Sequence, residues 1–211
     1  MSELVAAADP AAFERAATEL RAGRLVGIPT ETVYGLAALP DERSVEALIA
    51  AKLRSSDKGI QLLIDSLDQA RTVAVLSPAA EQLAEAFWPG GLTIVVERRP
   101  EAGLPLLLGG GRTTLGLRLP DHVVPRTLAR MLGPLAASSA NVTGYAPALD
   151  AWTIIELLGA EVGLILDDGP VRGGVASTVV DCTSAAPLVL REGAIRASEI
   201  FRALGQDYTS R

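Results

Sequence analysis

The hydrophobic positions of the chain follow helical and strand periods in turn along almost its whole length. Apolar residues at every third or fourth position predict helices in "DPAAFERAATELRAG", "DERSVEALIAAKLR" and "SPAAEQLAEAFWPGG", and further helices near 124–132, 150–158 and 198–204. Short apolar runs predict strands in "RLVGIPT", "IQLLID", "LTIVVERR", "TTLGLRLP", "PLAASSA", "VGLILDD", "ASTVVDCT" and "PLVLRE". The alternation predicts an α/β fold.

Helix start signals support this division. Asp9 is predicted to cap the first helix, with Pro10 at its first position, and Asp41 to cap the second. Ser77 followed by Pro78 gives the same signal at a third helix. The last three predicted strands follow one another without a helix, so we expect a mixed sheet.

Composition and charge narrow the class of protein. The 211 residues are 49% hydrophobic and 21% charged, which is typical of a globular protein with one large domain or two small ones. No repeat, low-complexity tract or linker interrupts the pattern, so we expect one domain over residues 1–211. The formal net charge of -6 argues against general nucleic-acid binding, although positive charge could still converge locally. The N-terminus lacks a signal-peptide pattern and no apolar run reaches membrane-spanning length, so we expect a soluble cytoplasmic protein.

The basic residues are distributed unevenly. Arginine is used almost throughout, whereas the only two lysines, Lys52 and Lys58, flank Arg54 in "AKLRSSDKGI". This segment leaves a predicted helix and enters a predicted strand. The concentration of both lysines marks this turn as a candidate functional segment.

The common catalytic signatures are absent from the sequence. No phosphate-binding glycine loop, nucleophile elbow or zinc-binding helix motif is present. His122 is the only histidine and is expected to be structural or to lie at a rim, and Cys182 is expected in the core. "PTETVYGLA" and "SSANVTG" concentrate small polar residues at strand ends, and their residues alone are compatible with self-satisfied loops or with ligand contacts.

Seven segments together resemble one known family. The segments are "PTETVYGLA", "KLRSSDKG", "WPGGLT", "LGLRLPDH", "ASSANVTG", "VASTVVD" and "VLREGAI". Their order and spacing are similar to those of the YrdC-like L-threonylcarbamoyladenylate synthases, over about residues 10–200. The chain resembles the short form, without the extra C-terminal domain.

This resemblance implies a fold and an activity. The implied fold is a single YrdC-like α/β domain, with a twisted mixed sheet and helices around a basic cavity. The implied enzyme is a nucleotidyltransferase that forms threonylcarbamoyl-AMP and pyrophosphate from L-threonine, bicarbonate and ATP with Mg²⁺. The product would serve threonylcarbamoyladenosine formation in tRNA, and tRNA or the downstream transferase proteins are candidate partners.

The resemblance also implies roles for individual residues. Lys52 and Arg54 correspond to the family's catalytic K-x-R pair, which is expected to face the ligand. The implied ATP contacts are Lys52, Arg54, Lys58, Thr114, Ser139, Asn141 and Arg191. The implied threonine contacts are Thr32, Arg118, Ala137 and Ser177, with Arg118 suited to hold the carboxylate in a bidentate pair.

The sequence departs from the family at turns that usually contain proline. Ser55, Gly91 and Glu192 occupy such positions, and loss of a fixed φ predicts looser turns. Two alternatives also remain open. One is a YrdC-like paralogue with another nucleotide-dependent activity, and the other is a non-catalytic RNA-binding module, which the acidic balance and few aromatic residues disfavour.

Overall fold

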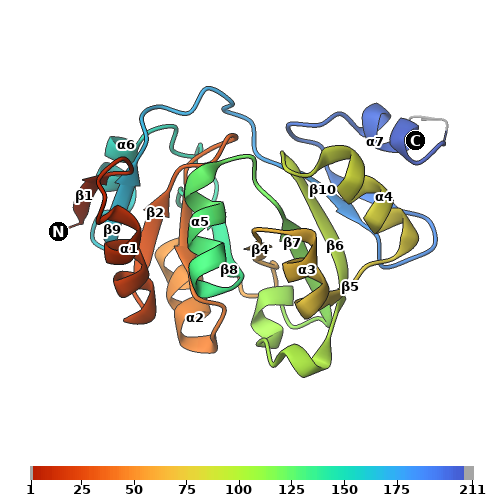
Figure 1. The fold of residues 1–211 in the computed structure, drawn as a ribbon, viewed down its shortest axis with the longest axis horizontal. Coiled ribbons are helices and arrows are strands. Elements are labelled where there is room, and N and C mark those ends of the chain that lie inside the picture. Colours follow the sequence, from red (N-terminus) through yellow and green to blue (C-terminus); the bar gives the residue numbers. More distant parts are fainter. Residues whose placement is uncertain (1, 207–211) are drawn as a thin grey trace.

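A computed structural model describes residues 2–206, which build an 11-stranded mixed sheet with helices packed against it. The strand order is β1-β9-β2-β3-β8-β4-β7-β6-β10-β11, and β5 pairs with β6. The two ends of this part of the chain lie at opposite ends of the sheet (Figure 1). The predicted mixed α/β fold is confirmed.

The strands are β1 (Glu3–Ala6), β2 (Leu25–Ile28), β3 (Gly35–Ala38), β4 (Gln61–Leu63), β5 (Ala74–Val75), β6 (Leu92–Arg98), β7 (Thr114–Arg118), β8 (Leu135–Ser139), β9 (Val162–Asp167), β10 (Thr178–Asp181) and β11 (Leu188–Arg191). The α-helices are α1 (Ala12–Arg21), α2 (Glu42–Ala51), α3 (Leu67–Val73), α4 (Pro78–Phe87), α5 (Val123–Leu132), α6 (Ala151–Leu158) and α7 (Ala197–Ala203). Two short 3₁₀ helices, η1 (Pro100–Ala102) and η2 (Leu106–Gly109), precede β7.

Two of the three predicted helix caps are confirmed. The Asp41 carboxylate accepts from the Ser44 N–H at 3.0 Å, and the Ser77 hydroxyl accepts from the Ala80 N–H. The predicted start of α1 is wrong. Asp9 accepts from the N–H of Ala11 at 2.8 Å and so closes a turn before the helix, which begins at Ala12.

The pattern missed four elements. These are β1, β3, α3 and β5, and β3 begins within the "PTETVYGLA" segment, whose residues alone were compatible with a self-satisfied loop or with ligand contacts. Its residues Gly35–Ala38 are all buried, three of them glycine or alanine, and they pair with β2 and β8 on either side. Tertiary pairing therefore overrides a weak local strand propensity.

Strict alternation along the strands places hydrophobic side chains on both faces of the sheet. In β8, Leu135 and Ala137 join one core cluster, whereas Ala136 joins the other. In β9, Leu164 and Ile165 separate in the same way. Helices α1 and α5 cover the face of Leu135, and α2, α4 and α6 contribute to the cluster that contains Ala136.

The face that α1 and α5 cover continues under the candidate site. Gln61 of β4 is paired with Ala137 and with Gly116 of β7, Gly116 with Val95 of β6, and Val95 with Asp181 of β10. Register partners share a face of a sheet, so these five residues extend the surface that carries Leu135. The same alternation that fills the core beneath α5 therefore presents polar and small residues farther along the sheet.

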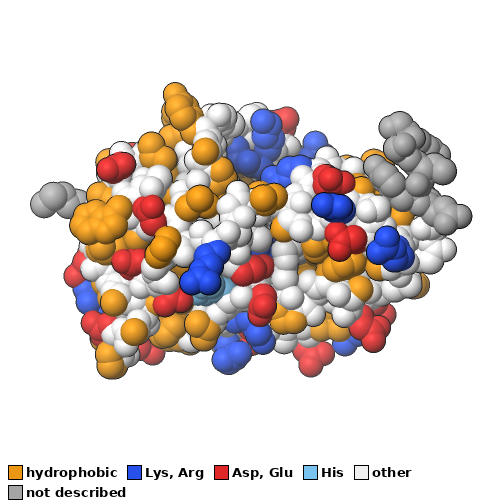
Figure 2. Space-filling model, turned by 90° about the horizontal axis from the view of Figure 1, so that it is seen from above, with side chains coloured by type: hydrophobic (Ala, Val, Ile, Leu, Met, Phe, Trp, Pro, Cys, Tyr) orange, Lys and Arg blue, Asp and Glu red, His pale blue; other side chains and the backbone are white. Residues whose placement is uncertain are grey.

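The outer surface and the helices add two observations. Acidic and basic side chains are interspersed over the face seen in Figure 2, with apolar side chains between them. None of the helices in residues 2–206 combines the length and the apolar character needed to cross a lipid bilayer.

Candidate functional site

A cavity of about 510 Å³ lies over the strands β8, β4, β7, β6 and β10. It is lined by Val33, Arg54, Gly59, Ile60, Gln61, Thr93, Val95, Leu108, Gly109, Arg112, Thr114, Gly116, Arg118, Ala137, Ser138, Ser139, Ala176, Ser177, Val179, Asp181, Leu190 and Arg191. Four arginines are present in this lining and only one carboxylate, that of Asp181. Its volume lies within the usual range for a site that binds a small molecule.

The floor of the cavity is made from small residues. Gly116 lies in the middle of β7, between Gln61 and Val95 in the register. A Cβ at Gly116 would lie 3.2 Å from Cγ2 of Thr93, closer than ordinary van der Waals contact. Ala137 on β8 adds only a methyl group. A ligand can therefore approach the sheet closely in this region.

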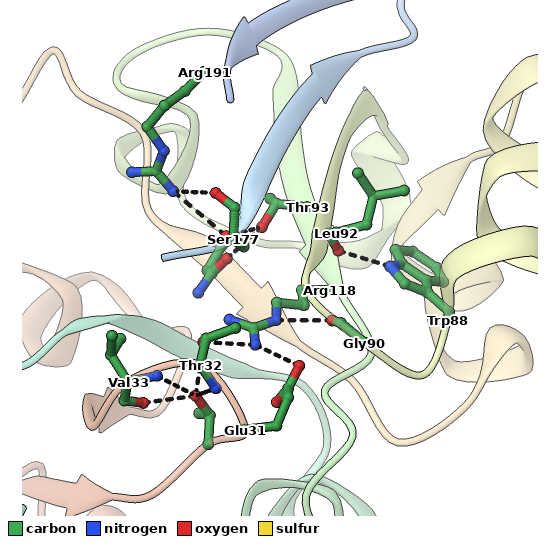
Figure 3. Close-up of polar contacts among 12 residues, drawn as sticks. Glu31, Thr32, Val33, Trp88, Gly90, Leu92, Thr93, Arg118, Ser177 and Arg191 are labelled. Carbon is green, nitrogen blue, oxygen red and sulfur yellow. Dashed lines mark hydrogen bonds and ion pairs between the residues drawn. The ribbon is translucent and has the colours of Figure 1, made fainter. Parts of the chain in front are cut away.

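Arg118, at the end of β7, is held firmly (Figure 3). Its Nε donates to the backbone oxygen of Gly90 at 3.1 Å, and its Nη2 donates to Glu31 Oε1 at 2.7 Å and to Thr32 Oγ1 at 2.9 Å. The Arg118 side chain is only 3% exposed. These bonds use three of its five N–H groups and leave both Nη1 hydrogens without a partner in residues 2–206.

Arg191, on β11, reaches the same cavity from the opposite side. Its Nη2 donates to the backbone oxygen of Ser177 at 2.7 Å. The Ser177 hydroxyl lies 2.8 Å from Thr93 Oγ1, which donates to Gln61 Oε1 at 2.7 Å. Figure 3 shows Ser177 between Arg191 and Thr93. This row of polar groups links β11, the residue before β10, β6 and β4 across the cavity.

Two further arginines enter the cavity from loops. Arg54 donates from Nη2 to the backbone oxygen of Gly59 at 2.8 Å. Arg112 donates from Nη1 to the backbone oxygens of Asp57 at 3.1 Å and Gly109 at 3.3 Å. Both guanidinium groups are therefore fixed by neutral carbonyl groups, and Arg112 ties the loop before β7 to the loop after α2.

Positive charge accumulates in this part of the cavity. Burial lowers the pKa of Arg54, and the nearby Arg191 lowers it further. Burial also lowers the pKa of Arg191, with a smaller contribution from Arg118. Like charges close enough to depress one another's pKa create a strong field for an anion.

Lys52 is placed differently from the expectation that it faces the ligand. Lys52 is 2% exposed and is not part of the cavity lining. Its Nζ donates to the backbone oxygen of Ser139, to that of Asn141 at 2.6 Å and to Asn141 Oδ1 at 3.2 Å. Burial, and then the charge of Arg54, lowers the pKa of Lys52 to about 8. Lys52 thus braces the end of β8 in this structure, and its contact with ATP stays a prediction.

The backbone explains why Lys52 and Arg54 diverge. Helix α2 ends in a Schellman motif, in which Leu53 N donates to Ala50 O and Arg54 N donates to Ile49 O. Leu53 occupies the left-handed position, with φ of 48° and 77% exposure. This turn directs Lys52 into the protein interior and Arg54 toward the cavity.

Ser139 and Asn141 of the "ASSANVTG" segment both contact the Lys52 ammonium group. Ser139 donates to Asn141 Oδ1 at 2.5 Å, and the Asn141 amide donates to the backbone oxygens of Val142 and Tyr145. Ser139 lines the cavity, whereas Asn141 is buried behind it. Thr114 contributes to the lining from the start of β7.

Lys58 and Ser55 belong to the turn that follows Arg54. Lys58 is exposed and lies outside the cavity lining, so its predicted phosphate contact stays a prediction. Ser55 hydrogen-bonds through its hydroxyl to Asp57 Oδ1, and its backbone oxygen accepts from Lys58 N. The serine therefore supplies local bonds in place of the fixed φ of proline.

Seven predicted site residues line the cavity: Arg54, Thr114, Arg118, Ala137, Ser139, Ser177 and Arg191. Thr32 does not line the cavity but accepts a hydrogen bond from Arg118, which does. Sequence reasoning missed Glu31, Gln61, Thr93, Arg112 and Asp181. Glu31, Thr93 and Asp181 fall within segments quoted in the sequence analysis. Gln61 could have been noticed as a polar residue inside the apolar strand "IQLLID". No sequence signal distinguished Arg112.

The residues assigned to structural roles behave as predicted. His122 caps α5, because its Nδ1 accepts from Val124 N at 3.2 Å. Burial lowers the pKa of His122, although Asp168 opposes this shift. Cys182 is 2% exposed, and burial raises the pKa of its thiol to about 11. The thiol is therefore protonated and unreactive at neutral pH.

Comparison with known proteins finds both a family and close relatives. The model of the Sua5, YciO and YrdC proteins, described as "Telomere recombination", matches residues 18–193. A Mycobacterium tuberculosis protein, named provisionally as a threonylcarbamoyl-AMP synthase, is 39% identical over 216 residues. That alignment covers 100% of this chain and 99% of the relative.

Proteins from Pyrococcus abyssi extend the similarity to three dimensions. The threonylcarbamoyl-AMP synthase of that organism is 38% identical over 194 residues, which cover 90% of this chain and 56% of the relative. The crystal structure of P. abyssi Sua5 complexed with L-threonine matches with a TM-score of 0.87 and 37% identity. It covers 92% of this chain and 58% of that chain.

Proposed function

The chain belongs to the Sua5/YciO/YrdC family, and we propose that it is an L-threonylcarbamoyladenylate synthase. Such an enzyme forms threonylcarbamoyl-AMP and pyrophosphate from L-threonine, bicarbonate and ATP. The observation that carries the proposal is the cavity whose lining contains four arginines, one of them buried at the end of β7. The names of the relatives support the same reaction.

Threonine is proposed to bind at the Arg118 end of the cavity. The free Nη1 group of Arg118 offers two donors to a carboxylate, and Ser177, directly before β10 and two strands away across β6, offers a hydroxyl. The P. abyssi structure complexed with L-threonine supports a threonine site in this fold. The guanidinium is already oriented by three hydrogen bonds, so little reorganisation is needed on binding.

ATP is proposed to place its phosphates among Arg54, Arg112 and Arg191. Their guanidinium groups are anchored to carbonyl oxygens and have no ion-pair partner within residues 2–206. Ser139 and Thr114 offer hydroxyl groups along the same wall. Lys58 lies on the neighbouring turn and is proposed to reach the phosphates when they are bound.

The chemistry requires positioning and charge stabilisation. A carbamate oxygen of N-carboxylated threonine attacks the α-phosphorus, a new P–O bond forms, and the bond to the leaving pyrophosphate breaks. Negative charge increases on the α-phosphoryl oxygens and on the pyrophosphate, and Arg54 and Arg191 stabilise it. No covalent nucleophile on the protein takes part, in keeping with the buried thiol of Cys182.

Mg²⁺ is proposed to enter with ATP. Within residues 2–206 no three acidic, histidine or cysteine side chains converge on one point, so the donor set fits an ion held mainly by phosphate oxygens and water. Asp181 is the one carboxylate in the lining. The ion would neutralise part of the triphosphate charge when bound.

The wider setting follows from the proposed product. Threonylcarbamoyl-AMP would be consumed in threonylcarbamoyladenosine formation on tRNA, so tRNA and the downstream transferase proteins are proposed partners. A cytoplasmic location is proposed because ATP, threonine and tRNA occur together there.

The decisive experiment measures pyrophosphate release by the purified protein with ATP, Mg²⁺, bicarbonate and radiolabelled threonine. We expect pyrophosphate and a labelled adenylate to form in equal amounts, and only when threonine is present. Threonine-independent pyrophosphate release would indicate a paralogue with another substrate. RNA binding without any adenylate would favour the non-catalytic alternative.

A further inference from the structure

The four arginines of the cavity differ in their partners. Arg54, Arg112 and Arg191 donate only to neutral oxygens, those of backbone carbonyls and of the Ser177 hydroxyl. None of the three has a carboxylate within ion-pair distance in residues 2–206. Arg118 alone is paired, with Glu31 at 2.7 Å.

Other carboxylates do not change this division. Asp181 lines the cavity, but its Oδ1 accepts from the backbone N–H and the hydroxyl of Thr183. The Asp57 carboxylate is bound to Ser55 and lies at the surface. The charge within hydrogen-bonding distance is therefore close to zero at the Arg118 end and strongly positive at the other.

Glu31 acts from outside the cavity. It is absent from the lining, and its side chain is 24% exposed. Its Oε1 accepts from Arg118, and its Oε2 is buried without a partner in the described chain. Within residues 2–206, the contact with the Arg118 guanidinium is the one hydrogen bond and ion pair of this carboxylate.

We propose that Glu31 is a specificity-determining residue, which neutralises Arg118 so that its end of the cavity accepts the net-neutral amino acid and rejects phosphate groups. The inference rests on the proposed function. Free threonine, before its N-carboxylation, is a zwitterion, whereas a phosphate group carries one to two negative charges and gains more from an uncompensated arginine. Without Glu31, triphosphate and threonine would compete for one continuous row of cations.

The magnitude supports a measurable effect. Unit charges a few ångströms apart in a partly buried site still interact appreciably, because solvent screens them less than at the surface. Removal of the Glu31 charge should therefore strengthen phosphate binding at Arg118 by about tenfold or more. Threonine, with no net charge, should gain much less.

The test is calorimetric titration of threonine into the protein, with and without inorganic phosphate. For the wild type we expect phosphate to leave the threonine Kd unchanged. For Glu31→Gln, which keeps an oxygen acceptor for Arg118, phosphate should raise the apparent threonine Kd about tenfold. An unchanged Kd in Glu31→Gln would overturn the inference.

Two further variants complete the experiment. Glu31→Asp keeps the charge but withdraws it from Arg118, so an intermediate phosphate effect is expected. If Glu31→Gln fails to fold, an Asp variant that behaves like the wild type overturns the inference. Glu81→Gln is the matched control, because Glu81 forms a surface ion pair with Arg71 at 3.0 Å and should change nothing. Absence of threonine binding in the wild type would instead contradict the proposed function.

Discussion

The two ends of the cavity solve the problem of holding arginine in different ways. At one end Arg118 is buried, paired with Glu31 and bound to Gly90. At the other end Arg54 and Arg191 are more exposed and rest only on neutral acceptors. The first arrangement joins binding to folding, because a buried charge needs its partners. The second leaves the charge available for a ligand.

Substitution of Arg118 should have the largest effect. Arg118→Ala leaves Glu31 without its partner, so we expect a loss of about 3 kcal/mol in the free energy of unfolding. Threonine-dependent pyrophosphate release should fall to near background. Urea unfolding and the activity assay measure the two effects. Full stability in this variant would break the distinction between the ends.

Substitution of Arg54 should separate activity from stability. Arg54→Ala removes a charge that would stabilise the transferring phosphoryl group, so kcat should fall about 100-fold. The free energy of unfolding should change by less than about 1 kcal/mol, since the lost bonds involve partly exposed loop carbonyls. A loss as large as that of Arg118→Ala would show that both ends are structural.

Lys52, which lies behind the Arg54 end of the cavity, should make the free energy of unfolding depend on pH. The folded pKa of Lys52, about 8, is below its ordinary 10.5, so the unfolded chain binds more protons between these values. The free energy of unfolding should therefore rise with pH across this window, by up to about 1.4 kcal/mol per unit, relative to Lys52→Met. The destabilising effect of burying the charged Lys52 ammonium is fully present below pH 8. Chemical denaturation between pH 7.5 and 9.5 tests this. If the free energies of unfolding of the wild type and Lys52→Met change with pH in parallel, the pKa of Lys52 is not lowered by burial.

The smallest effect is expected at Leu53. Its φ of 48° is unfavourable for a leucine, and the exposed side chain contributes little packing. Leu53→Gly should raise the free energy of unfolding by about 0.5–1 kcal/mol. The KM for ATP should stay unchanged if the turn keeps its geometry. A weaker affinity for ATP, measured in the same assay, would show that Leu53 helps to aim Arg54.

Sequence patterns predicted the kinds of element well and their partners poorly. Periodicity identified the long helices and most strands, because amphipathic spacing reflects burial directly. The strand Gly35–Ala38 was not predicted, since glycine and alanine have low strand propensity. Its burial depends on pairing with β8, about 100 residues away in the chain.

The site shows the same division. Motif resemblance identified Arg118 and Ser177 as neighbours of one ligand, and the structure brings both to the cavity. It did not identify the inward direction of Lys52, which depends on the left-handed turn at Leu53. The Glu31 pairing was also hidden, because it joins positions 87 residues apart. Local sequence carries residue type, whereas direction and pairing arise from the fold.

The glycine in the middle of β7 has a consequence for how this protein family can diverge. Gly116 needs no unusual backbone conformation; a Cβ there would crowd Thr93, and a larger side chain would take space from the cavity that Gly116 lines. We therefore expect the identity of this residue to track the size of the molecule bound above the sheet. A relative that has alanine or valine here would have a shallower floor, and this single position could be used to sort family members by the size of their substrates.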